Sequence, residues 1–154
     1  MPLKGIPKVL TPDILHALSS MGHGDEIVLA DAHFPASSVA KSSTCGTLEI
    51  RADACDSLPY LLESILKLFP LDEYVDEPVF LMDRVDSDKA INLQVKVWKE
   101  FDQILELSQG KKVKAKYVER FEFYEQAKKA YVIIQTGDTA QYGNIILKKG
   151  LVMH

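Results

Sequence analysis

The amino-acid sequence predicts a layered α/β domain in which a central sheet, mostly parallel or mixed, is flanked by helices. Short apolar runs typical of buried strands alternate along the chain with stretches whose apolar residues recur at helical spacing. A length of 154 residues suits one domain, so residues 1–154 are expected to form a single unit. With 47% hydrophobic and 26% charged residues, such a unit can bury a core without disulfides or a metal.

The first predicted elements are a helix and a buried strand. Thr11 can cap the helix, Pro12 suits its first turn, and Gly22 is expected to end it in a left-handed conformation. Residues 26–30, in which four apolar residues follow Glu26, predict a short buried strand. The chain therefore opens with a helix that leads through a glycine-bearing turn into the sheet.

The middle of the chain predicts two further strands with a helix between them. Residues 48–51 are a weaker strand candidate, and residues 57–69 carry one apolar helical face that Pro70 ends. Residues 79–82 are another apolar run, expected in the interior of the sheet. The remaining predicted elements, in order, are a helix around residues 95–105 closed by Gly110, a strand at 113–118, a helix at 121–129, and strands at 131–136 and 144–147.

The charge and cysteine content exclude several classes of protein. Eighteen basic and 22 acidic side chains give a net charge of −4, which argues against a nucleic-acid binder. No run approaches the ~20 apolar residues of a membrane-spanning helix, and residues 1–7 lack a secretory signal pattern. Cys45 and Cys55 cannot form a disulfide framework or a four-thiolate zinc site. We therefore expect a cytoplasmic protein, with neither nucleic acid nor membrane as partner.

His23 stands between two glycines in the predicted turn from helix to strand. The flanking glycines leave the imidazole reachable, and its ordinary pKa of ~6.5 suits proton transfer at neutral pH. Loop histidines are also common on surfaces that carry no chemistry. From this segment alone, a turn with a surface histidine is favoured over a catalytic histidine.

Asp31 follows the buried strand at 26–30, at the sheet edge where open α/β sheets bind ligands. We favour Asp31 as a hydrogen-bond acceptor for ligand hydroxyls. A metal site formed by Asp31, His33 and His23 is an alternative, because oxygen and imidazole suit several divalent ions. No HxH, HExxH or clustered-cysteine motif supports that alternative, which would make the protein a metal-dependent hydrolase.

Two aromatic segments near the C-terminus carry further candidates. Phe121 and Tyr124 share a helical face, where a buried aromatic pair with Arg120 in a surface ion pair is the simplest interpretation. Tyr142 and Asn144 lie between the last two strands and form either a plain turn or a phenol and an amide that face a ligand. Because GxGxxG, Walker lysine and GxSxG motifs are absent, nucleotide cofactors and serine catalysis have no support.

Five segments together carry a resemblance that no single one establishes. They are MGHGDEIVLADAHFP at 21–35, IRAD at 50–53, KLFPLDEY at 67–74, ERFEFYEQAKKA at 119–130 and QYGNIILKKG at 141–150. The sequences of these segments and their order along the chain resemble the RbsD/FucU family, and the resemblance runs from about residue 3 to residue 150. Cys55, where relatives usually carry glycine, and a longer Ser-rich insert at 36–47 depart from the family pattern.

The resemblance implies an isomerase, free of metal and organic cofactor, that interconverts the α and β anomers of a monosaccharide, above all L-fucose. It leaves an additional pyranase activity on D-ribose open. Members of the family assemble as ring-like homo-oligomers whose active sites lie at subunit contacts, so self-association is expected here. A protein that binds a monosaccharide without useful catalysis is the alternative.

The resemblance also assigns roles to individual residues. His23 matches the catalytic histidine that donates a proton, and Tyr124 and Tyr142 match active-site tyrosines. The positions that match residues contacting the sugar or ordering the site are Asp31, Asp72, Arg120 and Asn144. Mutarotation moves protons at the anomeric hydroxyl and the ring oxygen, which an imidazole and phenols can do. Which of His23, Tyr124 and Tyr142 serves the ring oxygen stays open.

Overall fold

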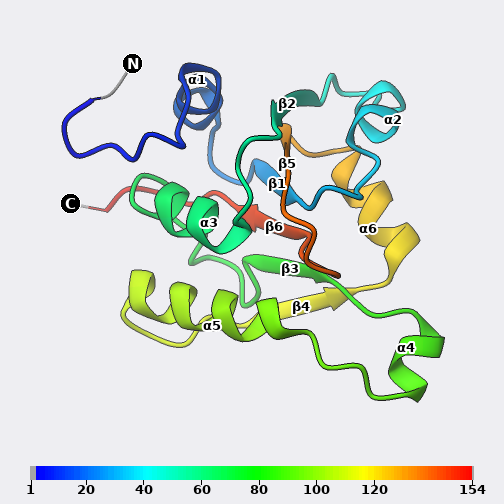
Figure 1. The fold of residues 1–154 in the computed structure, drawn as a ribbon. Coiled ribbons are helices and arrows are strands. Elements are labelled where there is room, and N and C mark those ends of the chain that lie inside the picture. The colour runs from blue at the N-terminus through cyan, green and yellow to red at the C-terminus, as the bar shows by residue number, and fades with distance from the viewer. Residues whose placement is uncertain (1–2, 154) are drawn as a thin grey trace.

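The computed structural model describes residues 3–153 and contains a mixed six-stranded sheet in the order β2-β5-β1-β6-β3-β4 (Figure 1). Five strands run parallel, and β6 is antiparallel to its neighbours β1 and β3. The carboxyl ends of the five strands therefore meet the amino end of β6 at one edge of the sheet, which we call the carboxyl edge. The strands are β1 (Glu26–Ala30), β2 (Leu48–Ala52), β3 (Val79–Met82), β4 (Ala115–Val118), β5 (Val132–Thr136) and β6 (Ile145–Lys148).

Helices cover both faces of this sheet and confirm the predicted layered α/β fold. In Figure 1, α1, α3 and α5 lie on one side of the sheet, α2 and α6 lie on the other, and α4 projects from the body. Among the described helices, none combines the length and the hydrophobicity needed to cross a bilayer. The helices are α1 (Pro12–Ser20), α2 (Ala36–Lys41), α3 (Leu58–Leu66), α4 (Asp86–Ala90), α5 (Lys96–Gln109) and α6 (Arg120–Ala127).

Strand β1 shows why its sequence is apolar from Ile27 to Ala30. Alternate side chains point to opposite faces of a strand. Ile27 and Leu29 pack with the core beneath α1, α3 and α5, whereas Val28 and Ala30 pack with the core beneath α2 and α6. Because both faces are covered, no position in the middle of the strand reaches water.

Helix α1 begins as predicted but ends differently. The Thr11 hydroxyl accepts a hydrogen bond from the backbone N–H three residues further on. The expected left-handed conformation at Gly22 is wrong, because Met21 leaves the helix in an extended conformation and Gly22 has no positive φ. The ammonium of Lys149 instead satisfies the helix end by donating to the carbonyl of Leu18 at 2.9 Å.

Two short helices lie where the sequence predicts no element. Helix α2 buries only Ala36 and Val39, and α4 buries no side chain at all. Neither segment is long enough to show an apolar period, so periodicity could not find them. Gly110, by contrast, closes α5 with a φ of 70° as its position predicts.

Candidate active site

The seven predicted site residues lie at two opposite edges of the sheet. His23 precedes β1, and the backbone N–H of Asp72 donates to the carbonyl of Lys148 at the end of β6, so both lie at what we call the amino edge. The five residues of β1 alone separate the two edges by about 13 Å. The residues at the carboxyl edge are Asp31, Arg120, Tyr124, Tyr142 and Asn144.

Asp31 and Asn144 form the buried centre of the carboxyl edge. The antiparallel pairing of β1 with β6 brings the end of one strand beside the start of the other. The Asn144 amide oxygen accepts a hydrogen bond from the Asp31 N–H at 2.8 Å, and the Asp31 carboxylate accepts one from the His33 N–H at 2.9 Å. Burial raises the pKa of Asp31 despite the backbone N–H groups that favour its charged form. The carboxylate is thus fixed in place behind the edge.

Tyr142 is held in an unusual backbone conformation at the same edge. Its φ of 56° is rare for a residue with a bulky side chain. The Trp98 indole N–H donates to the Tyr142 carbonyl at 3.0 Å and supports this conformation. The phenolic hydroxyl donates to Asp88 and accepts from the Val85 N–H at 3.2 Å. Burial and the hydrogen bond to Asp88 raise the pKa of Tyr142.

Arg120 and Tyr124 meet on the first turns of α6. The guanidinium Nε donates to the Tyr124 hydroxyl at 3.0 Å, and its carbon lies 5.6 Å from the centre of the ring. Phe121 lies against Tyr124 in an edge-on arrangement but is 65% exposed, so the interpretation of a buried aromatic pair is wrong. The Arg120 side chain is exposed at the surface.

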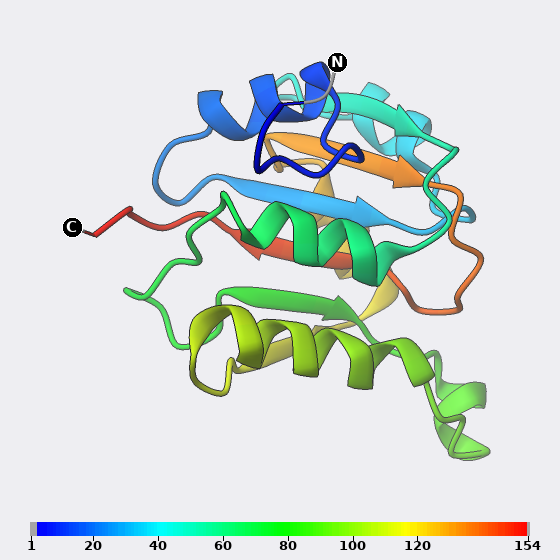
Figure 2. The ribbon, with the colours of Figure 1, turned by 60° about the vertical axis from the view of Figure 1, so that its left-hand side comes forward.

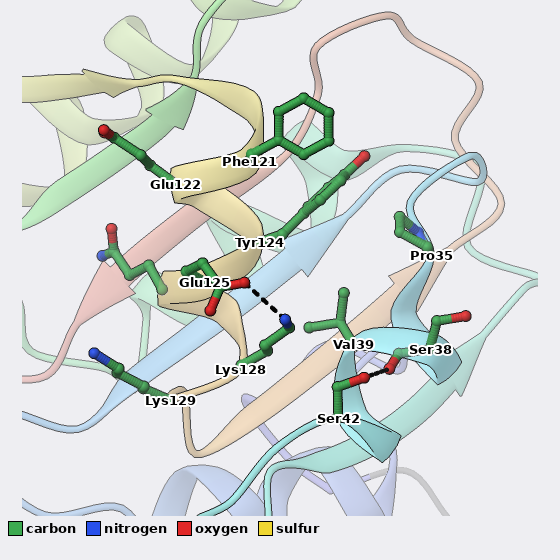
Figure 3. A pocket seen from close by; sticks show the side chains of 11 residues that line it. Pro35, Ser38, Val39, Ser42, Phe121, Glu122, Tyr124, Glu125, Lys128 and Lys129 are labelled. Atoms are coloured by element: carbon green, nitrogen blue, oxygen red, sulfur yellow. Dashed lines mark hydrogen bonds and ion pairs between the residues drawn. The ribbon is translucent and has the colours of Figure 1, made fainter.

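An open groove lies between α2 and α6. It measures about 700 Å³, and Figure 3 shows Phe121 and Tyr124 on one side of it facing Pro35 and Val39 on the other. Tyr124 is the one predicted site residue that lines this groove. The remaining residues of the carboxyl edge lie outside it, so the groove and the carboxyl edge meet at Tyr124.

The side chains of His23 and Asp72 lie within ion-pair distance of each other at the amino edge. The imidazole Nε2 lies 3.1 Å from the Asp72 carboxylate, and the His23 side chain is 40% exposed, as its flanking glycines predict. Asp72 is buried and also accepts the Tyr74 N–H at 3.0 Å. Burial alone would raise the pKa of Asp72, but the hydrogen bonds from Tyr74 and His23 outweigh it and lower the pKa.

The alternative of a metal site is not supported by this arrangement. Asp31 and His33 lie at the carboxyl edge, whereas His23 lies at the amino edge, so the three side chains do not converge. Between residues 3 and 153 there is no group of three or more His, Cys, Asp or Glu side chains that could hold a metal ion.

Sequence reasoning missed Asp88 and Trp98, which both contact Tyr142. Asp88 lies 54 positions before Tyr142 and Trp98 lies 44 before it. Trp98 stands in a predicted helix, where its apolar spacing indicates only packing. Asp88 lies in a charged segment without any motif, so only the folded chain reveals the contact.

The fold and these side chains define an α/β protein with polar and aromatic residues gathered at the carboxyl edge of a mixed sheet and a histidine–aspartate pair at the opposite edge. The chain belongs to the RbsD/FucU family: the family described as RbsD / FucU transport protein family matches residues 4–152.

Relatives and solved structures of this family cover nearly the whole chain. The fucose mutarotase of Mus musculus is 57% identical over 148 residues, covering 96% of this chain and 94% of the relative. The fucose mutarotase of Streptococcus pneumoniae, solved in complex with L-fucose, matches with a TM-score of 0.83 and 45% identity over 98% of this chain and all of that one. RbsD of Bacillus subtilis, solved with D-ribose, shares the fold with a TM-score of 0.66 at 24% identity over 99% of this chain and all of that one.

Proposed function

We propose that the chain is a mutarotase that interconverts α- and β-L-fucose by acid–base opening and closing of the sugar ring. The observation that carries this proposal is the similarity to the mouse fucose mutarotase along nearly the whole of both chains. The similarity to the pneumococcal enzyme solved with L-fucose supports the same substrate. Residues 1–154 would form one domain, and free Cys45 and Cys55 suit the reducing conditions of the cytoplasm.

The carboxyl edge has the chemistry that a monosaccharide requires. Vicinal hydroxyls both donate and accept hydrogen bonds, so they bind to carboxylates, amides and guanidinium groups placed side by side. Asp31, Asn144 and Arg120 supply these groups, and the rings of Tyr124 and Tyr142 supply flat surfaces for the C–H faces of the sugar. We therefore propose that these five residues bind the sugar.

The reaction itself is a movement of protons. One group takes the proton of the anomeric O1–H while another protonates the ring oxygen O5, the C1–O5 bond breaks, and C1 becomes an aldehyde. Rotation about the C1–C2 bond and closure by the reverse transfers give the other anomer. Each positioned proton carrier contributes about 10²–10⁴ in rate. His23, Tyr124 and Tyr142 are the proposed carriers, and because only protons move, the proposal includes neither a metal nor an organic cofactor.

A site that uses both edges of the sheet requires two copies of the chain. One sugar cannot contact His23 and Tyr142 of the same copy, because the length of β1 lies between them. Exposed apolar side chains accompany His23 at the amino edge, with Tyr74 and Met153 each 74% exposed and Val152 65% exposed. We propose that the amino edge of one copy packs against the carboxyl edge of the next, which generates a ring when the rotation closes.

Exchange NMR tests the proposed function directly. Saturation of the α-anomeric proton of L-fucose is expected to transfer to the β-anomeric proton faster when catalytic amounts of the protein are present. Binding of L-fucose without faster exchange would instead show a non-catalytic sugar-binding protein. The same measurement on D-ribose, following pyranose and furanose signals, tests whether the activity extends to that sugar. Protein denatured by heat serves as the control.

A further inference from the structure

The two hydrogen bonds of the Tyr142 hydroxyl limit what this group can offer to a ligand. A phenol carries one hydrogen and accepts through its remaining lone pairs. Within residues 3–153, the hydrogen points to the Asp88 carboxylate, and the Val85 N–H donates to the oxygen at 3.2 Å. What the hydroxyl offers to a ligand is therefore its remaining acceptor capacity rather than its hydrogen.

Asp88 is fixed in this position although α4 buries no side chain. The Arg84 guanidinium donates to the carbonyl of Leu93 at 2.8 Å and so joins the two ends of the segment that carries α4. The Lys89 ammonium lies 3.0 Å from the Asp83 carboxylate at the end of β3. These contacts link α4 to the end of β3, beyond which α4 projects from the sheet in Figure 2.

The same network reaches the backbone of Tyr142. The Arg84 guanidinium carbon lies 5.8 Å from the centre of the Trp98 ring, and the Trp98 indole donates to the Tyr142 carbonyl at 3.0 Å. The segment that holds Asp88 and the turn that holds Tyr142 are thus fixed relative to each other from two sides.

We propose that Asp88 is a positioning residue that makes Tyr142 the group accepting the proton of the anomeric hydroxyl. The O1–H proton passes to the Tyr142 oxygen as the phenolic hydrogen passes to the Asp88 carboxylate. The electron pair of O1–H forms the C1=O bond, the C1–O5 bond breaks, and O5 keeps its electron pair and takes a proton from His23 of a second copy. Closure reverses every transfer. This inference rests on the proposed mutarotase function.

The electrostatics of the pair agree with this assignment. Burial and the neighbouring carboxylate raise the pKa of Tyr142, so the phenol keeps its hydrogen at neutral pH. A neutral phenol can act as a base only if its own hydrogen has somewhere to go. The Asp88 carboxylate provides that acceptor, and it becomes neutral for as long as the open-chain sugar exists.

The test is a double-mutant cycle with Asp88→Asn and Tyr142→Phe, read by exchange NMR on L-fucose. The asparagine keeps the shape and can accept the phenolic hydrogen bond, but it cannot take the proton. Asp88→Asn is expected to lower kcat by about 10- to 100-fold with little change in KM. In the Tyr142→Phe background, Asp88→Asn is expected to have no further effect, because Asp88 acts only through the phenol.

Asp86→Asn is the matched control. It removes the same charge from the same helix, and among residues 3–153 the hydrogen bonds of the Tyr142 hydroxyl go to Asp88 and Val85 rather than to Asp86. Its kcat is expected to equal that of the wild type, and the thermal midpoints of all variants show whether the fold persists. Wild-type kcat in Asp88→Asn, or losses that add in the double variant, would overturn the inference while leaving the mutarotase function intact. Failure of the wild type to exchange L-fucose would instead overturn the proposed function.

Discussion

The imidazole of His23 lies 3.1 Å from the Asp72 carboxylate, and this pair stands alone at the amino edge, a strand length away from every other predicted site residue. Asp72 is buried and held by the Tyr74 N–H, whereas the His23 side chain is 40% exposed. A fixed carboxylate therefore orients an imidazole that faces outward, which is the arrangement required if the histidine acts in the site of a neighbouring copy.

Replacing His23 by alanine is expected to slow anomer exchange without unfolding the protein. The loss of one proton carrier corresponds to about 10²–10⁴ in rate. The free energy of unfolding is expected to fall by only about 0.5–1.5 kcal/mol, because the imidazole is 40% exposed and the buried Asp72 carboxylate keeps its hydrogen bond from the Tyr74 N–H. Exchange NMR and urea unfolding measure the two quantities. His16→Ala, at an exposed position of α1, is the control and retains wild-type exchange.

Mixing two inactive variants is expected to restore activity if sites are shared between copies. His23→Ala and Tyr142→Phe each disable every site in their own oligomers. In randomly mixed oligomers, about a quarter of the sites combine an intact histidine with an intact tyrosine from the next copy. Co-expression followed by exchange NMR measures the recovery. If co-expressed chains stay as inactive as either variant although they co-purify, both residues act within one copy.

Asp31 and Asp72 are expected to make the stability of the protein depend on pH with opposite signs. The pKa of Asp31 is raised from its ordinary value of 3.8. The contribution of Asp31 to the free energy of unfolding therefore falls as pH rises from 3.8 through the raised pKa, and it is constant above that pKa. The pKa of Asp72 is lowered from 3.8, so its contribution is complete above pH 3.8 and is lost as pH falls through the lowered pKa.

Urea unfolding of Asp31→Asn and Asp72→Asn over a series of pH values measures these contributions. Relative to the wild type, Asp31→Asn is expected to gain stability as pH rises above 3.8, whereas Asp72→Asn is expected to lose stability as pH rises toward 3.8. If the free energies of unfolding of the two variants, relative to the wild type, changed with pH in the same direction, the assignment of opposite pKa shifts would be contradicted.

Arg120→Ala is expected to raise the Kd for the sugar by a larger factor than it lowers kcat. The guanidinium lies at the surface beside the Tyr124 hydroxyl, and a hydrogen bond from a charged group contributes ~1.5–3 kcal/mol, about a tenfold change in Kd or more. NMR titration with L-fucose measures Kd, and exchange at saturating sugar measures kcat. Lys129→Ala removes an exposed cation just beyond α6 and should leave both quantities unchanged.

Local chemistry explains why much of the fold was predictable. The Thr11 cap, the apolar run in β1 after Glu26 and the glycine that closes α5 each act within a few residues, and each prediction is confirmed. The position of Asp31 directly after β1 likewise predicted its place at the carboxyl edge. Helix α4 was missed because it buries no side chain and leaves no periodic pattern.

The arrangement of the site could not be predicted from the same information. His23, Asp31 and His33 have side chains that suit a divalent ion, which left a metal site open as an alternative, but a complete strand separates His23 from the other two. Asp72 reaches His23 across 49 positions, and Asp88 reaches Tyr142 across 54. Contacts of this kind depend on strand order and direction, which neither composition nor spacing determines.

Gly150→Ala is expected to damage the histidine–aspartate pair through the backbone. A Cβ at this position would lie 2.7 Å from the Asp72 Cα and also against the carbonyl of Leu71, and neither backbone atom can move away cheaply. We expect the free energy of unfolding to fall by about 1–3 kcal/mol, and exchange to slow as Asp72 shifts from His23. Gly22→Ala, whose Cβ would meet only the flexible Asp25 carboxylate at 3.7 Å, is the control for stability at the same edge. Urea unfolding and exchange NMR provide both readouts, and unchanged stability in Gly150→Ala would show that the backbone here has more room than its packing indicates.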